Sequence, residues 1–275
     1  MTSPYWDENL AETYRRFQFE FPEKSLAGMS VVVAGGTGGL GAATVVRLAL
    51  EGAHPIVGYR ENRERAGMLS AAIEKRFGRK LLLVEGDISE ARTREKFLEV
   101  AANSGASLAG AAIFPGHPAR VTWQDLDRES LLASMEKNYV GPLLLARDLG
   151  EAMEKNSQGG SIVLLATMQA LAAFPSSLNY AAPKAAMVHA AKILAQQWSR
   201  VQVNVVAPGA TLAGMASASI QSGKYDRHIA GGAIGRFGRP EDVARAVRFF
   251  LEPDNYVTGQ TLLVDGGLTL RRDRG

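Results

Sequence analysis

Short apolar runs alternate with longer helical patterns along most of this 275-residue chain. The expected strands lie at residues 30–34, 55–57, 80–84, 108–114, 161–165, 201–206 and 261–264. Helices are expected at 42–51, 61–77, 90–102, 124–155 (with a bend at Gly141-Pro142), 240–251 and in the segment that begins near Tyr180. Strands that are apolar on both faces, separated by helices, are typical of parallel sheets with right-handed crossovers. We therefore expect an α/β fold: a doubly wound parallel sheet of about seven strands with helices on both faces.

Composition places the chain among single-domain globular proteins. Hydrophobic residues make up 46% and charged residues 21%, and a chain of this length can bury roughly 75% of its unfolded surface. No linker or short repeat divides it, so we expect an N-terminal extension, residues 1–27, and one domain, residues 28–275. Its 31 basic and 28 acidic residues give a net charge of +3 without a long basic run, which offers little support for nucleic-acid binding. The four histidines lie far apart in sequence, so no metal site is expected.

The sequence predicts a soluble, cytoplasmic protein. It contains no cysteine, which excludes disulfides and is compatible with a reducing compartment. Residues 1–27 carry charges where a signal peptide would need an apolar core. The longest uncharged stretch, residues 159–183, contains Thr167, Gln169 and Asn179, and its apolar segments are shorter than the roughly 20 residues that span a membrane.

A glycine-rich turn, Ala34-Gly-Gly-Thr-Gly-Gly-Leu-Gly41, follows the first expected strand and opens a helix. Glycines allow a pyrophosphate to approach the backbone, and the helix N-terminus supplies unpaired N–H groups with a partial positive charge. Two registers fit: G-x-G-x-x-G from Gly36, or G-x-x-x-G-x-G through Gly35, Gly39 and Gly41. The turn predicts a dinucleotide site of the Rossmann type, the alternative being a merely structural tight turn.

The end of the second strand indicates which dinucleotide is bound. An acidic residue about 20 positions after the glycines would bind the ribose 2′-hydroxyl of NAD, but this chain has Gly58-Tyr59-Arg60. An Arg suits a 2′-phosphate through a charge-assisted hydrogen bond worth roughly 1.5–3 kcal/mol, or roughly 10- to 100-fold in preference. We therefore predict NADP(H) as cofactor, unless Arg60 is an ordinary solvent-facing residue.

Tyr180 and Lys184 lie four residues apart at the start of a helix made mainly of small apolar residues. Positions i and i+4 share one helix face, with Cβ atoms about 5–6 Å apart. The pair is either a surface Tyr whose ring rests on a Lys stem or a proton-transfer pair. A cation at about 4 Å would stabilise a phenolate by up to ~4 kcal/mol at an effective dielectric near 20, and so lower the pKa of the phenol.

From Leu26 onward the chain resembles the short-chain dehydrogenase/reductase family, and within it most the 3-oxoacyl-(acyl carrier protein) reductases. The resemblance rests on several motifs in the family's order: the glycine turn, Asp87-Ile88, Asn138 in KNYVG, Tyr180-x-x-x-Lys184, Pro208-Gly209, GRFGRPEDVA from Gly235, and VTGQTLLVDGG from Val257. It implies an oxidoreductase that transfers a hydride between NADP(H) and a ketone, 3-oxoacyl group or alcohol. It also implies a homo-oligomer, a homotetramer or a dimer, with a small-molecule substrate and no nucleic-acid or membrane partner.

The resemblance also implies the site residues. Tyr180 is the expected proton donor, and Lys184 lowers its pKa and holds the nicotinamide ribose. Thr167 stands where the family has a Ser that donates to the carbonyl oxygen, and Asn138 anchors a water on the path to Lys184. The expected catalytic residues are therefore Asn138, Thr167, Tyr180 and Lys184. The expected cofactor-binding residues are Gly35, Thr37, Gly38, Gly39, Leu40, Gly41, Tyr59, Arg60, Asp87, Ile88, Gly116, Tyr180, Lys184, Pro208, Gly209 and Thr211.

The chain departs from the family pattern at several positions. Ala34 replaces a Thr, and Ile113-Phe-Pro-Gly116 replaces Asn-Asn-Ala-Gly, so we expect apolar packing in place of two polar ties between strands. Gly38 stands where many NADP-binding members have a basic residue. These changes leave a second interpretation open, a catalytically lapsed NADP(H)-binding protein of the same fold.

Two further segments carry expectations. Residues 210–237 resemble the family's substrate lid, and Gln169, Phe174 and Met215 are expected pocket walls, with His117 beside the pocket. Residues 1–27 contain several aromatic side chains, so we expect them to pack against the body or against a neighbouring subunit.

Overall fold

The computed structural model describes residues 3–174, 177–214 and 216–271. Seven parallel strands form one sheet in the order β3-β2-β1-β4-β5-β6-β7, which confirms the expected doubly wound fold. The strands are β1 Ser30–Ala34, β2 His54–Tyr59, β3 Leu82–Glu85, β4 Leu108–Ile113, β5 Gly160–Leu165, β6 Val201–Pro208 and β7 Thr261–Val264. Every residue of β1 is buried, as expected of a central strand covered on both faces.

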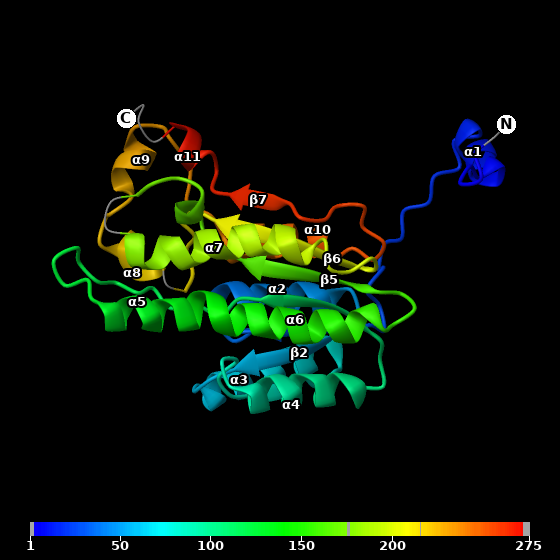
Figure 1. Cartoon of the computed structure of the whole chain (residues 1–275), viewed down its shortest axis with the longest axis horizontal. Coiled ribbons are helices and arrows are strands. Elements are labelled where there is room, and N and C mark those ends of the chain that lie inside the picture. The colour runs from blue at the N-terminus through cyan, green and yellow to red at the C-terminus, as the bar shows by residue number, and fades with distance from the viewer. Residues whose placement is uncertain (1–2, 175–176, 215, 272–275) are drawn as a thin grey trace.

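Helices cover both faces of the sheet. The longer helices between strands are α2 Gly39–Leu50, α3 Arg63–Phe77, α4 Ala91–Ala102, α5 Arg128–Met135, α6 Gly141–Glu154, α7 Leu178–Leu194 and α10 Pro240–Phe250. One core lies under α4, α6 and α7 and includes Phe97, Leu149 and Met187, whereas the other lies under α2, α3 and α10 and includes Leu48 and Val247. Figure 1 shows α4, α6 and α7 as the front layer, with α2 and α10 behind the sheet.

The helical region between β4 and β5 differs from the single bent helix expected at residues 124–155. Asp127 caps α5, so the helix begins at Arg128, and a π-helical turn, η1 Glu136–Val140, separates α5 from α6. Gly141 N–H bonds to the carbonyl of Glu136, five residues earlier. Pro142 has no N–H and would crowd the carbonyl of Asn138 in a regular helix. This explains why the hydrogen-bond pattern changes from α-helical to π-helical just before it. The irregularity therefore precedes Gly141-Pro142 rather than lying on it.

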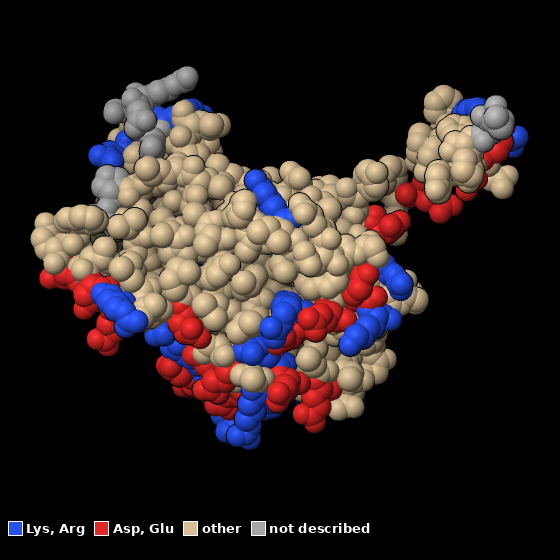
Figure 2. Space-filling view, in the orientation of Figure 1, with Lys and Arg blue, Asp and Glu red and all other residues tan. Residues whose placement is uncertain are grey.

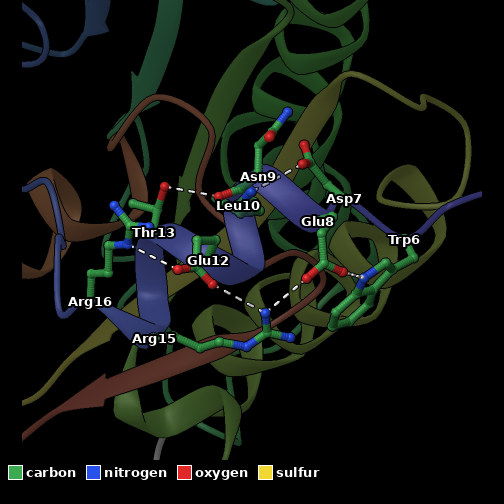
Figure 3. Close-up of polar contacts among 9 residues, drawn as sticks. All are labelled: Trp6, Asp7, Glu8, Asn9, Leu10, Glu12, Thr13, Arg15 and Arg16. Carbon is green, nitrogen blue, oxygen red and sulfur yellow. Dashed lines mark hydrogen bonds and ion pairs between the residues drawn. The ribbon is translucent and has the colours of Figure 1, made fainter.

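The N-terminal segment stands apart from the body. Helix α1, Glu8–Arg15, is capped by Asp7 and buries none of its residues. Figure 1 shows that an extended segment without secondary structure joins it to the body. Its polar contacts are internal: Trp6 Nε1 donates to Glu8, and Arg15 and Arg16 pair with Glu8 and Glu12 (Figure 3). For residues 3–24, packing on the body, the first of the two expected placements, is therefore not found, and contact with a neighbouring subunit stays a prediction.

The packed body begins at Ser25 and Leu26. Leu26 is fully buried, and the Ser25 hydroxyl accepts a hydrogen bond of 2.7 Å from Arg248 Nη2. Figure 2 shows that charged side chains gather over the α3 and α4 side, whereas the face over α7 carries few. None of the helices in the described part of the chain is long and apolar enough to cross a membrane.

Candidate active site

A large cavity lies at the carboxyl ends of the central strands, where parallel doubly wound sheets place their ligand sites. It has a volume of about 970 Å³ and is lined by the glycine turn after β1 and by the loops after β4, β5 and β6. A second cavity of about 330 Å³ lies on the β2 and β3 side. Both are lined by Gly35, Thr37, Tyr59, Arg60, Pro115 and Gly116, so the two cavities adjoin.

The glycine turn favours one of the two expected registers. Gly35 has φ +72°, and a Cβ on Gly41 would lie 2.3 Å from the Gly35 carbonyl oxygen. A Cβ on Gly39 would lie 2.7 Å from that of Ala213, whereas one on Gly38 would meet nothing closer than 3.4 Å. Gly36 is also tightly packed, since a Cβ there would lie 2.8 Å from Val57 Cγ1 and 2.9 Å from Val33 O. The space at Gly38 and the crowding at Gly39 are what favour the G-x-x-x-G-x-G register over the register from Gly36. The bare backbone leaves a cradle at the start of α2 that fits a pyrophosphate.

The second cavity contains the residues expected on the adenosine side. Tyr59 donates to Glu85 across 3.0 Å, and Asp87 accepts from the backbone and hydroxyl of Ser89. Burial raises the pKa of Asp87, but the bonds from Ser89 and the charges of Arg60 and Lys137 outweigh burial and lower the pKa overall. Asp87 and Ile88, two of the expected cofactor-binding residues, line this cavity.

Arg60 lines both cavities but is not without acidic neighbours. Its Nε lies 2.8 Å from Glu61, and its Nη1 lies 3.7 Å from Asp87. Half of its side chain is exposed, so these ion pairs are weak and exchangeable. A 2′-phosphate would have to compete with Glu61 for the guanidinium.

Tyr180 and Thr167 meet at the wall of the large cavity. Thr167 is buried after β5, where it caps the 3₁₀ turn η2 Met168–Ala170 and accepts from Gln169 N. Burial raises the pKa of Tyr180 to about 12, although a hydrogen bond with Thr167 acts in the opposite direction. The two hydroxyls are thus neighbours, as two donors to one carbonyl oxygen must be.

Lys184 is held by the backbone. It is almost fully buried, and its Nζ donates to the carbonyls of Leu165 at 2.8 Å and Pro115 at 3.4 Å. Burial lowers the pKa of Lys184 to about 8. With this pKa, Lys184 is a neutral amine at the pH where Tyr180, with a pKa of about 12, ionises. The expected lowering of the Tyr180 pKa by Lys184 is therefore not found in this arrangement, where the pKa of Tyr180 is raised.

Asn138 ties the π-helical turn to the loop after β4. Its Oδ1 accepts from His117 N at 2.9 Å, and its Nδ2 donates to His117 O at 3.0 Å and to Ser134 Oγ at 3.1 Å. Gly116 fits between Asn138 and Lys184, because a Cβ there would lie 2.9 Å from Asn138 Oδ1 and 3.3 Å from Lys184 Nζ. Asn138 therefore lies next to the lysine, behind the cavity wall rather than in it.

The remaining expected residues fall into two groups. The large cavity is lined by Pro208 at the end of β6 and by Gly209 and Thr211 after it. Its lining also includes the expected residues Thr37, Gly38, Leu40 and Gln169. Phe174 does not line it; this expectation was wrong, because its ring packs beside a small core that includes Met168 and Tyr225. His117 lines the smaller cavity instead of the substrate side, and Met215 lies outside the described residues.

Where the chain departs from the family pattern at Ala34 and Ile113, apolar packing takes the place of the polar ties between strands, as expected. Ala34 pairs with Ile113 across β1 and β4, both are buried, and Phe114 N donates to Ala34 O at 3.0 Å. Among the described residues, none of the buried side-chain polar atoms that lack a partner lies at this junction.

Two cavity residues were not singled out by the sequence. Arg120, in the loop after β4, and Lys224, in the 210–237 segment, line the substrate side. Tyr225, named only as part of the lid, is buried there and takes a hydrogen bond with Gln169. No periodicity or motif marks such loop residues, since only the folded chain brings them to one cavity. The segment itself forms two short helices, α8 Ala216–Gln221 and α9 Asp226–Ala230.

Comparison with known proteins gives consistent matches. Residues 34–269 match the family model described as Enoyl-(Acyl carrier protein) reductase. The chain is 28% identical over 251 residues to the glucose 1-dehydrogenase of Gluconobacter oxydans, covering 90% of this chain and 94% of that protein. It is 30% identical over 257 residues to 3beta-hydroxysteroid dehydrogenase 1 of Eggerthella lenta, covering 89% and 95%. It is 29% identical over 254 residues to the L-rhamnose 1-dehydrogenase (NAD(P)(+)) of Azotobacter vinelandii, covering 88% and 97%.

Solved structures agree with these matches. A dehydrogenase/reductase from Sinorhizobium meliloti 1021 superposes with a TM-score of 0.79 at 28% identity, covering 89% of this chain and 96% of that one. A short chain dehydrogenase/reductase family protein gives a TM-score of 0.77 at 27% identity, covering 88% and 98%.

Proposed function

This chain belongs to the short-chain dehydrogenase/reductase family, and the relatives reported above include sugar and steroid dehydrogenases. We propose that it is an NADPH-dependent reductase of a ketone or 3-oxoacyl group, or catalyses the reverse oxidation. At the coarser level it is a nicotinamide-dependent oxidoreductase that acts on CH–OH or C=O groups. The observation that carries the finer proposal is the meeting of Thr167, Tyr180 and Lys184 in one cavity with the glycine turn.

The cofactor would be held by the residues that line the adjoining cavities. Gly35, Gly39 and Gly41 leave room for the pyrophosphate, and Asp87 with Ile88 lies on the adenosine side. Lys184, fixed by two backbone carbonyls, is placed to bind the nicotinamide ribose. When bound, NADPH supplies the hydride that the carbonyl carbon accepts.

Tyr180 supplies the proton in this proposal. A phenol whose pKa is raised by burial stays protonated at neutral pH, so it can donate to the oxygen on which negative charge develops. The Thr167 hydroxyl donates to the same oxygen and stabilises that charge. In the oxidative direction the phenol must first lose its proton, and the nearby Lys184 and Asn138 are the groups through which that proton would leave.

NADPH is proposed over NADH on the strength of Arg60, which lines the cavities after β2. Glu61 competes for this guanidinium, and Gly38 offers no second cation. The alternative of a catalytically lapsed protein is favoured only by Thr167 and the altered strand junction. Oxidation of NADPH and NADH, followed by absorbance with a panel of ketones and acyl thioesters, decides between the two. Turnover with no member of the panel would support the lapsed protein.

We also propose a homodimer or homotetramer in the cytoplasm, with residues 28–275 as the catalytic domain and 210–237 as its substrate lid. The weakly charged face over α7 in Figure 2, with Leu178 and Ile193 about half exposed, supports self-association. Sedimentation velocity of the purified protein tests the oligomeric state.

A further inference from the structure

The charges of the large cavity are of one sign. Its basic lining residues are Arg60, Arg120, Lys184 and Lys224, and none of the described residues that line it is Asp or Glu. In the proposed function Arg60 and Lys184 contact the cofactor, whereas Arg120 and Lys224 line the same cavity and have no role in binding the cofactor. A cavity lined by cations alone attracts anions and raises their local concentration.

Arg120 is placed by a constrained turn. Ala119, the residue before it, has φ +44°, a left-handed conformation that costs free energy for a residue with a Cβ. Hydrogen bonds hold this conformation from both sides: Ala119 N donates to His117 Nδ1 at 3.1 Å, and Asn179 Nδ2 donates to Ala119 O at 3.5 Å. The turn that presents Arg120 is therefore anchored to the residue preceding Tyr180.

Arg120 and Lys224 come from different loops and meet at Ser219, whose carbonyl accepts from Lys224 N at 3.1 Å. Arg120 comes from the loop after β4, and its Nη2 lies 3.5 Å from Ser219 Oγ on α8. Lys224 Nζ lies 5.8 Å from the centre of the Tyr225 ring. Tyr225 lies close enough to interact electrostatically with both Arg120 and Tyr180. Figure 1 shows the loop before α5 and the helices α8 and α9 at the same end of the sheet. The two cations therefore line the same cavity as the proton donor, Tyr180.

We propose that the substrate is a carbonyl or alcohol compound that also carries an oxyanion, a carboxylate or a phosphate, which Arg120 and Lys224 bind while Tyr180 and Thr167 contact the reacting oxygen. The proposal rests on the proposed function and names its substrate class. A guanidinium presents paired N–H donors that match the oxygens of either anion. The reaction is unchanged: the carbonyl carbon gains a hydride from the cofactor, its oxygen gains the proton of Tyr180, and the anionic group keeps its charge.

Matched substrates test the proposal. NADPH-dependent kcat/KM is measured for 4-oxopentanoate and its methyl ester, and for dihydroxyacetone phosphate and dihydroxyacetone. We expect the charged member of at least one pair to be preferred by roughly tenfold or more, and Arg120→Gln to reduce that preference roughly 10- to 100-fold, the range for a hydrogen bond to a charged group. The pair that shows the preference identifies the anion as carboxylate or phosphate. Lys224→Gln should have a smaller effect, because an ammonium lacks the paired N–H donors that a guanidinium presents to an oxyanion.

Ser219→Ala is the matched control, because it removes the contact of Arg120 with α8 and keeps the guanidinium. We expect it to retain the preference for the charged substrate. If Ser219→Ala reduced the preference as much as Arg120→Gln, Arg120 would act by holding the lid and the proposal would be overturned. Equal kcat/KM for the charged and neutral members of both pairs would also overturn it, with the proposed function left standing.

A binding measurement separates this proposal from the proposed function. Calorimetric titration with pentanoate and with pentanamide should show binding of pentanoate only, and loss of that binding in Arg120→Gln. Such binding without turnover of any ketone would refute the reductase and retain the anion site. Equal binding of pentanoate and pentanamide would refute a carboxylate site.

Discussion

Thr167 is the residue at which the proposed reaction centre differs from the family pattern. Its hydroxyl lies beside the Tyr180 phenol, and its extended backbone at the end of β5 fixes its direction. A β-branched side chain is stiff at χ1, so the hydroxyl of Thr167 is held in one orientation.

Thr167→Val removes this donor and nearly conserves shape. We expect kcat to fall by about 10²–10³, or ~2.7–4 kcal/mol, the usual cost of one donor to a developing oxyanion. Thr167→Ser keeps the hydroxyl and should lose less than about tenfold. Steady-state kinetics of the three proteins on one reactive ketone make the comparison. Equal kcat for Thr167→Val and the wild type would assign the oxyanion to another group.

Arg60 decides the choice of cofactor in this account. Arg60→Asp should shift the ratio of kcat/KM from NADPH toward NADH by roughly tenfold or more, since an anion would face the 2′-phosphate. Glu61→Gln is the informative partner variant: it removes the carboxylate 2.8 Å from Arg60 Nε and should shift the ratio toward NADPH. An unchanged ratio in Arg60→Asp would remove Arg60 from the cofactor site.

At the scale of elements, Pro183 in α7 explains a contact that positions the catalytic helix. Proline cannot donate to the carbonyl four residues earlier, so the carbonyl of Asn179 lacks its helical partner. The Ser134 hydroxyl of α5 donates to that carbonyl and accepts from Asn138 Nδ2. One buried hydroxyl thus joins α5, the π-helical turn and α7 directly beside Tyr180.

Ser134→Ala should lower the free energy of unfolding by about 1–3 kcal/mol, because it leaves the buried Asn179 carbonyl without a donor. Ser222→Ala is a control of the same chemistry, since its hydroxyl bonds the Ser219 carbonyl at an exposed site, and it should change stability by less than about 0.5 kcal/mol. Urea unfolding measures both variants. Equal stability of Ser134→Ala and the wild type would show that the carbonyl finds water or another donor.

The order of elements was predictable from local pattern, but these helix contacts were not. The seven strands and their helices follow from apolar periodicity and from the glycine turn. The π-helical turn, in contrast, depends on Pro142 and on hydrogen bonds from Asn138 to His117, 21 residues away in sequence. The role of Ser134 depends on the carbonyl of Asn179, 45 residues away in sequence, so no local sequence pattern could reveal it.

Across the whole molecule, the candidate site is assembled from loops at one edge of the sheet. Most residues of the family motifs line the cavities at that edge, because carboxyl ends of parallel strands meet there. Arg120, Lys224 and the effect of burial on Tyr180 were missed, since burial and loop position belong to the folded chain. The aromatic side chains of the N-terminal segment are exposed, so of its two expected placements packing on the body is not found for residues 3–24, and contact with a neighbouring subunit stays a prediction.

Lys184 links the site to the stability of the whole molecule. Its folded-state pKa of about 8 lies below the ordinary value, so between pH 8 and 10 the unfolded chain binds more protons and stability rises with pH. Over these two units the contribution is about 2.7 kcal/mol at 1.36 kcal/mol per unit, an upper limit. Above pH 10 the raised pKa of Tyr180 acts in the opposite direction.

Urea unfolding of the wild type and Lys184→Met at pH 8 and pH 10 tests this linkage. We expect the stability of the wild type relative to Lys184→Met to increase toward pH 10. A relative stability that is constant or falls over this range would mean that Lys184 keeps its charge when buried.

The central claim is that Tyr180 donates the proton in a nicotinamide-dependent carbonyl reduction. The most direct measurement compares the wild type with Tyr180→Phe, which keeps the ring and removes the hydroxyl, by single-turnover NADPH oxidation with a reactive ketone and by NADPH binding. The account predicts that binding is retained and that the rate falls by roughly 10²–10⁴, the range for a positioned proton donor. A rate in Tyr180→Phe equal to that of the wild type would contradict the claim.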